Sequence, residues 1–244
     1  RDAIRRLLWV PERKVFADCL TDEGLSGQIS YQTNFAAIWS GIMTDEEAEY
    51  FVAEVFMKGQ CPPLTGAFFY HIVLEVLFER GYGGKALEII RSYWGEMLAR
   101  GATTWWETFD SSTAHCTIPS PYQGNTPTYL MDHIPVSHCH GWGASPTYLL
   151  TQQVLGIDVS DLANLTVTFT PFTGGLEWAR GSVPTAYGWI RAEWRLRNDG
   201  TASFTAEIPG RLTWKSPKLE NVAVKEKEGT VTVSGIFRDP SGAA

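Results

Sequence analysis

Glu107 is the residue whose type and neighbours point most directly to chemistry. It ends the stretch Gly-Ala-Thr-Thr-Trp-Trp-Glu at residues 101–107, directly after Trp105 and Trp106, and it is the only glutamate in residues 101–156. A carboxylate beside two indoles can have its pKa raised by desolvation or can be held as the anion by nearby donors, so either acid or base work suits it. The alternative is a partly exposed loop glutamate without a chemical role.

A second group of chemically capable residues occupies residues 137–146, which read Ser-His-Cys-His-Gly-Trp-Gly-Ala-Ser-Pro. Together with His115 and Cys116 this group offers a Cys/His set for zinc. The paired spacing of zinc fingers is missing, however, and adjacent His-Cys-His residues do not readily converge on one tetrahedral centre. We therefore expect no metal and no cofactor, and instead a histidine that bonds a sugar hydroxyl or a catalytic carboxylate.

Residues 101–156 contain no Lys or Arg and only three acids, yet they hold four of the five histidines. They also contain Trp105, Trp106 and Trp142. Surface loops are normally rich in charge, so this composition predicts the lining of a pocket for a neutral ligand. The alternative is a loop that packs on a neighbouring surface.

The elements before this segment are predicted to be helical. Hydrophobic spacing indicates helices over residues 1–9, 28–42, 65–80, 84–100 and 146–156, with a further helix after Thr44 as its cap. Buried and one-sided helices alternate, which is typical of concentric helical hairpins. That pattern brings the connections 10–27, 58–64 and 102–145 to one end, with His71 expected in the core.

After Ile157 the hydrophobic period changes to two, which indicates strands. Asn198-Asp199-Gly200 is a strong hairpin signal between two alternating runs. The sequence therefore predicts an α+β chain, with a helical domain over residues 1–156 and an antiparallel β-sandwich over residues 157–244.

Composition excludes several function classes. The 244 residues carry a net charge of −7 and a pI of about 5.3, which argues against a nucleic-acid partner. The most apolar stretch, residues 66–78, is too short to span a bilayer. Four scattered cysteines favour reduced thiols, and with no signal peptide in the sequence a cytoplasmic and a secreted location both stay open. Phosphate-loop, dinucleotide and nucleophile-elbow motifs are missing.

The two motifs, in this order and spacing, resemble the α-L-rhamnosidases of glycoside hydrolase family 78. The family motif GATT-x-W-E matches residues 101–107. Its later motif Ser-x-(Asn/Cys)-His, before an inner helix that ends in Gly-Ile, matches Ser137, Cys139, His140 and residues 156–157. Residues 181–188 and the strand after them resemble the family's C-terminal β-domain.

The resemblance implies an (α/α)₆ barrel followed by a β-sandwich, and hydrolysis of terminal α-L-rhamnose with inversion at the anomeric carbon. It aligns Glu107 with the general base that activates a water. It aligns His140 with a residue that contacts the sugar or supports the base. Trp106, with Trp105 and Trp142, would form apolar walls against the sugar.

The sequence departs from the family in helix number, because the barrel needs twelve helices and about six are predicted here. The resemblance places the general acid upstream, so we expect half a barrel, a missing N-terminal half as partner, and an inactive fragment. Asp18 and Asp22 could add polar contacts at the same end. The alternatives are a carbohydrate-binding fragment without activity, or a related glycosidase acting on another neutral sugar.

Overall fold

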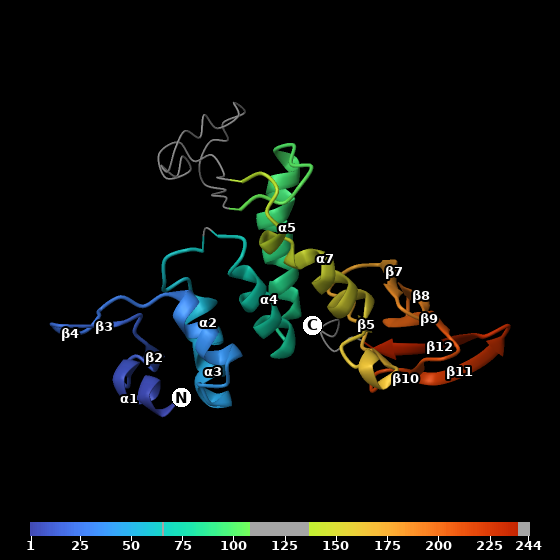
Figure 1. Ribbon diagram of the computed structural model, residues 1–244, viewed down its shortest axis with the longest axis horizontal. Helices are drawn as coiled ribbons and strands as arrows, with labels where there is room; N and C mark the ends of the chain where they lie inside the picture. Colours follow the sequence, from blue (N-terminus) through green and yellow to red (C-terminus); the bar gives the residue numbers. More distant parts are fainter. Residues whose placement is uncertain (65, 108–136, 239–244) are drawn as a thin grey trace. The chain divides into compact units, whose positions relative to one another are not determined.

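The computed structural model describes residues 1–64, 66–107 and 137–238, and it divides the chain into two compact units. The first unit, Arg1–Ser145, holds most of the helices, and the second, Pro146–Ala244, holds the large β-sheet (Figure 1). The predicted α+β composition is therefore confirmed. None of the helices in the described ranges combines the length and the apolarity that a membrane crossing requires.

The first unit begins with a short exposed helix and two small hairpins. These are α1 (Asp2–Leu8), β1 (Trp9–Val10) with β2 (Val15–Phe16), and β3 (Leu20–Thr21) with β4 (Gly24–Leu25). The carboxylate of Asp18 then accepts bonds from the backbone N–H of Ser30 at 3.0 Å and from the Thr33 hydroxyl at 2.7 Å. It thereby fixes the start of α2 (Tyr31–Trp39), for which Ser30 is the N-cap. Asp18 thus has a structural role in the fold.

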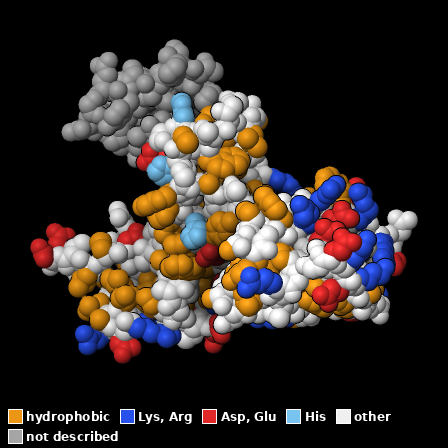
Figure 2. Space-filling view, turned by 45° about the vertical axis from the view of Figure 1, so that its right-hand side comes forward, with side chains coloured by type: hydrophobic (Ala, Val, Ile, Leu, Met, Phe, Trp, Pro, Cys, Tyr) orange, Lys and Arg blue, Asp and Glu red, His pale blue; other side chains and the backbone are white. Residues whose placement is uncertain are grey.

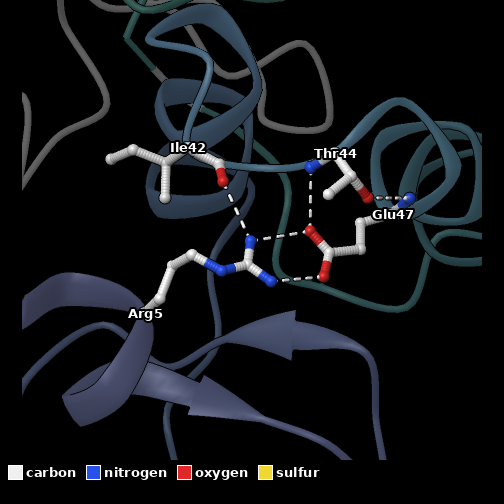
Figure 3. A network of polar contacts seen from close by, with 4 residues as sticks. All are labelled: Arg5, Ile42, Thr44 and Glu47. Atoms are coloured by element: carbon white, nitrogen blue, oxygen red, sulfur yellow. Dashed lines mark hydrogen bonds and ion pairs between the residues drawn. The ribbon is translucent and has the colours of Figure 1, made fainter. Parts of the chain in front are cut away.

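The next helix, α3 (Asp45–Tyr50), starts at the predicted cap Thr44 and continues as the π-helical turn η1 (Phe51–Phe56). The Thr44 hydroxyl accepts from the Glu47 N–H at 3.3 Å, and Glu47 accepts from the Thr44 N–H at 2.8 Å. This is a capping box, which satisfies two otherwise free donors. Arg5 adds a bidentate bond to Glu47, at 2.6 and 2.8 Å, and a bond to the carbonyl of Ile42 (Figure 3).

Aromatic rings hold α2 and η1 together. The ring of Phe35 lies edge-on to Phe51 and Phe56, with centroids 5.4 and 4.9 Å apart. Tyr31 makes the same kind of contact with Phe56 at 5.1 Å. Each edge-to-face pair contributes about 0.5–1.5 kcal/mol beyond the burial of its area. The apolar side of the helix predicted after Thr44 therefore packs against α2.

Two longer helices, α4 (Tyr70–Glu79) and α5 (Gly83–Ala99), complete the helical core of the first unit. The prediction that the first of them begins at residue 65 is wrong. Residues 66–69 form a turn, and the helix begins at Tyr70. Gly101 follows α5 with φ +88°, a left-handed conformation that glycine commonly adopts after a helix end. The predicted alternation is wrong at the helix over residues 146–156, which was expected to be buried but exposes Tyr148 and Leu150. The barrel itself stays a prediction.

The second unit opens with a helix that packs against its main sheet. This helix comprises α7 (Ser145–Leu149) and the π-helical turn η3 (Leu150–Leu155), and it ends at Gly156 with φ +84°. The indole N–H of Trp194 donates to the carbonyl of Val154 at 2.9 Å. The compact unit therefore starts at Pro146, ahead of the domain boundary predicted near residue 157.

The main sheet has five antiparallel strands in the order β11-β12-β9-β8-β7. Their bounds are β7 (Trp178–Thr185), β8 (Gly188–Leu196), β9 (Thr201–Pro209), β11 (Glu220–Lys227) and β12 (Thr230–Arg238). One face is apolar and buried, with Ile190, Trp194, Phe204 and Phe237 among its residues. The hairpin predicted at Asn198-Asp199-Gly200 is confirmed between β8 and β9.

A smaller sheet in the same unit has the order β10-β6-β5, with β5 (Ile157–Asp158), β6 (Thr166–Phe169) and β10 (Thr213–Lys215). The two sheets make the region sandwich-like, as predicted. The prediction of purely antiparallel pairing is wrong at one place, because β10 pairs with β6 in parallel. Parallel neighbours need a long connection, and here the three strands β7 to β9 supply it.

Candidate active site

The structure brings the two predicted motifs side by side in the first unit. The backbone N–H of His140 donates to the carbonyl of Trp105 at 2.8 Å, and the N–H of Glu107 donates to the carbonyl of Ser137 at 2.9 Å. The Thr104 hydroxyl also donates to the carbonyl of His138. Segments 104–107 and 137–140 are therefore held by three hydrogen bonds, two of them between backbones.

A third segment, residues 66–69, joins them. The N–H of Ala67 donates to the carbonyl of Glu107 at 3.2 Å, so both backbone polar groups of Glu107 are engaged. The ring of Phe68 lies 5.0 Å from that of Trp142, tilted by 38°. Sequence reasoning missed this segment because it was assigned to the following helix. Gly66 at its start is the one sequence signal that could have placed the turn there.

Gly143 is the tightest point of the junction. Its carbonyl accepts the indole N–H of Trp94 at 2.7 Å, from a side chain of α5 that is almost fully buried. A Cβ added at Gly143 would lie 3.0 Å from the carbonyl oxygen of Trp106 and 3.2 Å from the Cβ of Ala67. The short 3₁₀ turn η2 (Gly141–Gly143) can therefore approach the other two segments only because residue 143 lacks a side chain.

The tryptophans of the site differ sharply in exposure. Trp106 is 5% exposed and its ring lies 5.6 Å from that of His138, whereas Trp142 is 70% exposed. Trp105 is half-buried. The ring of His140, also half-buried, lies 6.3 Å from that of Trp142. Trp106 thus supports the site from within, while Trp142 presents the largest free aromatic surface beside His140.

Below these segments lies an aromatic floor on α4 and α5. Tyr70 packs against Tyr93 and Trp94, with centroids 4.8 and 5.7 Å apart. Its burial raises the pKa of the phenol to about 12, so Tyr70 stays neutral at physiological pH. The floor is therefore uncharged, in keeping with the lack of Lys and Arg in residues 101–156.

Glu107 itself is half-buried, on a main chain pinned from both sides. A carboxylate on so fixed a backbone can accept a proton from a water with little loss of orientation. His140 reaches the same junction from the neighbouring segment. The junction therefore places one acidic residue, Glu107, and His140 on segments that are joined by backbone hydrogen bonds.

Two sequence expectations concern residues outside this junction. His71 was expected in the core, but its side chain is 35% exposed and its Nε2 lies 3.7 Å from Oε1 of Glu75. That expectation is wrong, because His71 lies in the first turn of α4 on a partly exposed side of the helix, next to Glu75. His115 and Cys116 lie outside the described residues, and residues 1–64, 66–107 and 137–238 contain no group of three His, Cys, Asp or Glu placed to hold a metal.

Comparison with protein families gives a match in the second unit. Residues 156–229 match the family model described as bacterial alpha-L-rhamnosidase C-terminal domain. No curated protein matches the sequence.

Solved structures match over most of the chain. A family 78 rhamnosidase of Bacillus sp. GL1 is 27% identical with a TM-score of 0.71, covering 88% of this chain and 22% of that one. An α-L-rhamnosidase of Aspergillus terreus is 18% identical with a TM-score of 0.62, covering 94% and 25%, and it supports the fold alone. The predicted resemblance is confirmed, and the chain spans about a quarter of the length of these proteins or less.

Proposed function

We propose that this chain, which resembles part of the family 78 α-L-rhamnosidases, carries half of the active site of an exo-acting glycosidase that removes terminal α-L-rhamnose. The observation that supports this most directly is the junction of the two motifs. Glu107 and Ser137 share a backbone hydrogen bond, and His140 bonds Trp105. A match of motif letters alone would not require the two segments to touch.

In the proposed reaction Glu107 is the general base. Its carboxylate takes a proton from a water, and the water oxygen attacks the anomeric carbon from the face opposite the departing aglycone. A second carboxylic acid protonates the glycosidic oxygen, about 6.5–9.5 Å from the base in inverting enzymes. We assign that acid to a part of the protein outside this chain, so the chain alone should not turn over substrate.

The sugar would lie against aromatic surface. Trp142 exposes most of its ring and is backed by Phe68, which gives an apolar wall for the C–H face and the methyl group of a deoxyhexose. His140, beside that ring, would donate to or accept from a sugar hydroxyl. Trp105 and Trp106 would line and support the site from the adjacent segment.

The test uses the longer protein that contains this chain, with an aryl α-L-rhamnoside as substrate. Glu107→Gln should lower kcat by at least about a thousandfold with KM little changed, because a base acts in the transition state. The matched control is Glu88→Gln, an exposed glutamate of α5 that pairs with Lys85. NMR of the first sugar released should show the inverted anomer. Full turnover by Glu107→Gln would overturn the assignment.

A binding fragment is the second candidate, favoured by the high exposure of Trp142 in the chain as it stands. Titration of the 244-residue chain with rhamnose should quench tryptophan fluorescence, and Trp142→Ala should remove the change. A panel of aryl glycosides given to the longer protein decides between rhamnose and another neutral sugar. Binding and hydrolysis are thus measured separately.

A further inference from the structure

The solvent face of the five-stranded sheet carries a groove that the proposed glycosidase site does not use. Two adjoining hollows, of about 510 and 470 Å³, share Trp178, Arg180, Glu193 and Thr205 in their linings and so form one concavity. It lies over β7, β8 and β9, within the second unit. Figure 2 shows basic and acidic side chains interspersed over this part of the molecule.

The side chains of the groove lie in regular rows, because the register of the strands places them opposite one another. Three rows run across β7, β8 and β9, and they are Trp178–Arg195–Ser203, Arg180–Glu193–Thr205 and Ser182–Arg191–Glu207. Each row contains one arginine and at least one hydroxyl or carboxylate. Residues two apart on a strand share a face, so the rows follow one another at about 6.8 Å.

The arginines are available for a ligand. Within the groove lining the described structure has one ion pair, Arg180 with Glu193, and its atoms are 3.9 Å apart on side chains 78% and 62% exposed. An ion pair with this separation and exposure is weak, so it does not hold Arg180 in place. Three arginines against Glu193 and Glu207 leave the lining at 3 − 2 = +1, although the whole chain carries −7.

Two exposed tryptophans lie on this face of the sheet, one in the lining of the groove and one outside it. Trp178 is 55% exposed and lies directly opposite Arg195 on the next strand. Trp189, 52% exposed, precedes Arg191 by two residues on the same face of β8. Exposed indoles beside arginines and hydroxyls suit a ligand that is flat and apolar on one side and polar at its edges.

We propose that this groove binds an extended acidic oligosaccharide, one whose sugars carry uronate carboxylates. The guanidinium groups of Arg180, Arg191 and Arg195 would take the carboxylates, since arginine matches their planar geometry. Glu193 and Glu207 would accept sugar hydroxyls, and Trp178 would stack on a ring face. The inference does not rest on rhamnosidase activity, because the groove lies wholly within the second unit.

The experiment is a calorimetric titration of the 244-residue chain with tetragalacturonate and with its methyl ester. The ester keeps the sugar backbone and removes the charge, so it should bind at least about tenfold more weakly. Arg191→Gln and Trp178→Ala should each weaken tetragalacturonate binding by a similar factor. The control is Arg211→Gln, a cation of the same unit that stacks on Tyr187 and does not line the groove.

All three substituted side chains are exposed, so far-UV circular dichroism and the urea unfolding midpoint should be unchanged, which separates loss of binding from loss of folding. Absence of binding, or equal binding of acid and ester, would overturn the proposal. Equal binding of a glutamate tetrapeptide would overturn the saccharide class and leave only a site for anions. Unchanged affinity in both groove variants would place binding elsewhere on the chain.

Discussion

The backbone N–H of Glu107 donates to the carbonyl of Ser137 at 2.9 Å, so the main chain of the residue proposed as base is bonded to the loop proposed to bind sugar. Any change that displaces the second motif therefore moves the main chain of the first. Errors of about 1 Å in the position of a catalytic group can cost a hundredfold in rate. The geometry of the junction should thus be visible in kinetics even where no catalytic side chain is altered.

Gly143→Ala should damage this junction. The new Cβ would lie 3.0 Å from the carbonyl of Trp106, and backbone atoms give way less easily than side-chain ends. We expect at least about a tenfold loss in kcat/KM of the longer protein on an aryl rhamnoside. Gly141→Ala, in the same turn, meets nothing within 4 Å and should stay within about twofold. Equal losses in both variants would contradict the account.

The Arg5–Glu47 pair should make stability depend on pH. Arginine bonds hold the pKa of Glu47 at about 2, below its ordinary 4.5. A lowered carboxyl pKa stabilises the folded state above pH 4.5, and that gain is lost as the pH falls toward 2. Because both side chains keep some contact with water, we expect about 1–2 kcal/mol.

Urea unfolding followed by far-UV circular dichroism at pH 6 and pH 3 measures this effect. Arg5→Gln should lose about 1–2 kcal/mol at pH 6 and less than half of that at pH 3, since Glu47 is then almost fully protonated in the unfolded chain. Lys58→Gln is the control, because its pair with Glu54 is exposed on both sides. It should change stability by less than about 0.5 kcal/mol at either pH. A pH-independent effect of Arg5→Gln would count against the ion pair.

Gly156→Ala should be severely destabilising. A Cβ there would lie 2.4 Å from the nitrogen of Pro171, and the backbone has φ +84°, which L-residues rarely adopt. We expect a loss above about 3 kcal/mol. Gly95→Ala, inside α5 with open space around it, should stabilise the chain by about 0.5–1 kcal/mol. Thermal unfolding of both variants measures the contrast, and similar midpoints would refute it.

Trp94→Phe should weaken the floor of the site. It removes the indole N–H that bonds the carbonyl of Gly143 at 2.7 Å and leaves that carbonyl without this donor in the interior. The expected cost is about 1–3 kcal/mol. Trp39→Phe breaks an equally short bond, to Glu75, on a side chain 53% exposed, and should cost under about 0.5 kcal/mol. Chemical denaturation compares the two.

Local signals in the sequence predicted most elements well. Thr44 followed three residues later by Glu47 predicts a capped helix, and both bonds of the capping box form. Alternation from residue 188 to 208 predicts strands β8 and β9, because one face of the sheet must be buried. Such signals depend only on near neighbours in the chain.

Errors arose where a contact distant in sequence decides the structure. Residues 66–69 are apolar enough for a helix, yet the N–H of Ala67 is taken by the carbonyl of Glu107, far along the chain. The turn is therefore set by tertiary packing. For the site, composition predicted a neutral pocket lining in residues 101–156, and the family resemblance placed Glu107 and His140 in one site. Nothing in the sequence distinguishes buried Trp106 from exposed Trp142.

The parallel pairing of β10 with β6 has a consequence for how the second unit assembles. Thr166 and Thr213, which share a hydroxyl contact at 3.0 Å, are 47 residues apart, and β7, β8 and β9 lie between them. Loop closure over that span costs entropy that the antiparallel meander does not incur. On the ribosome the small sheet can close only after residue 215 has emerged, so strands β7, β8 and β9 have the chance to pair first, and β11 and β12 join them after β10 has emerged.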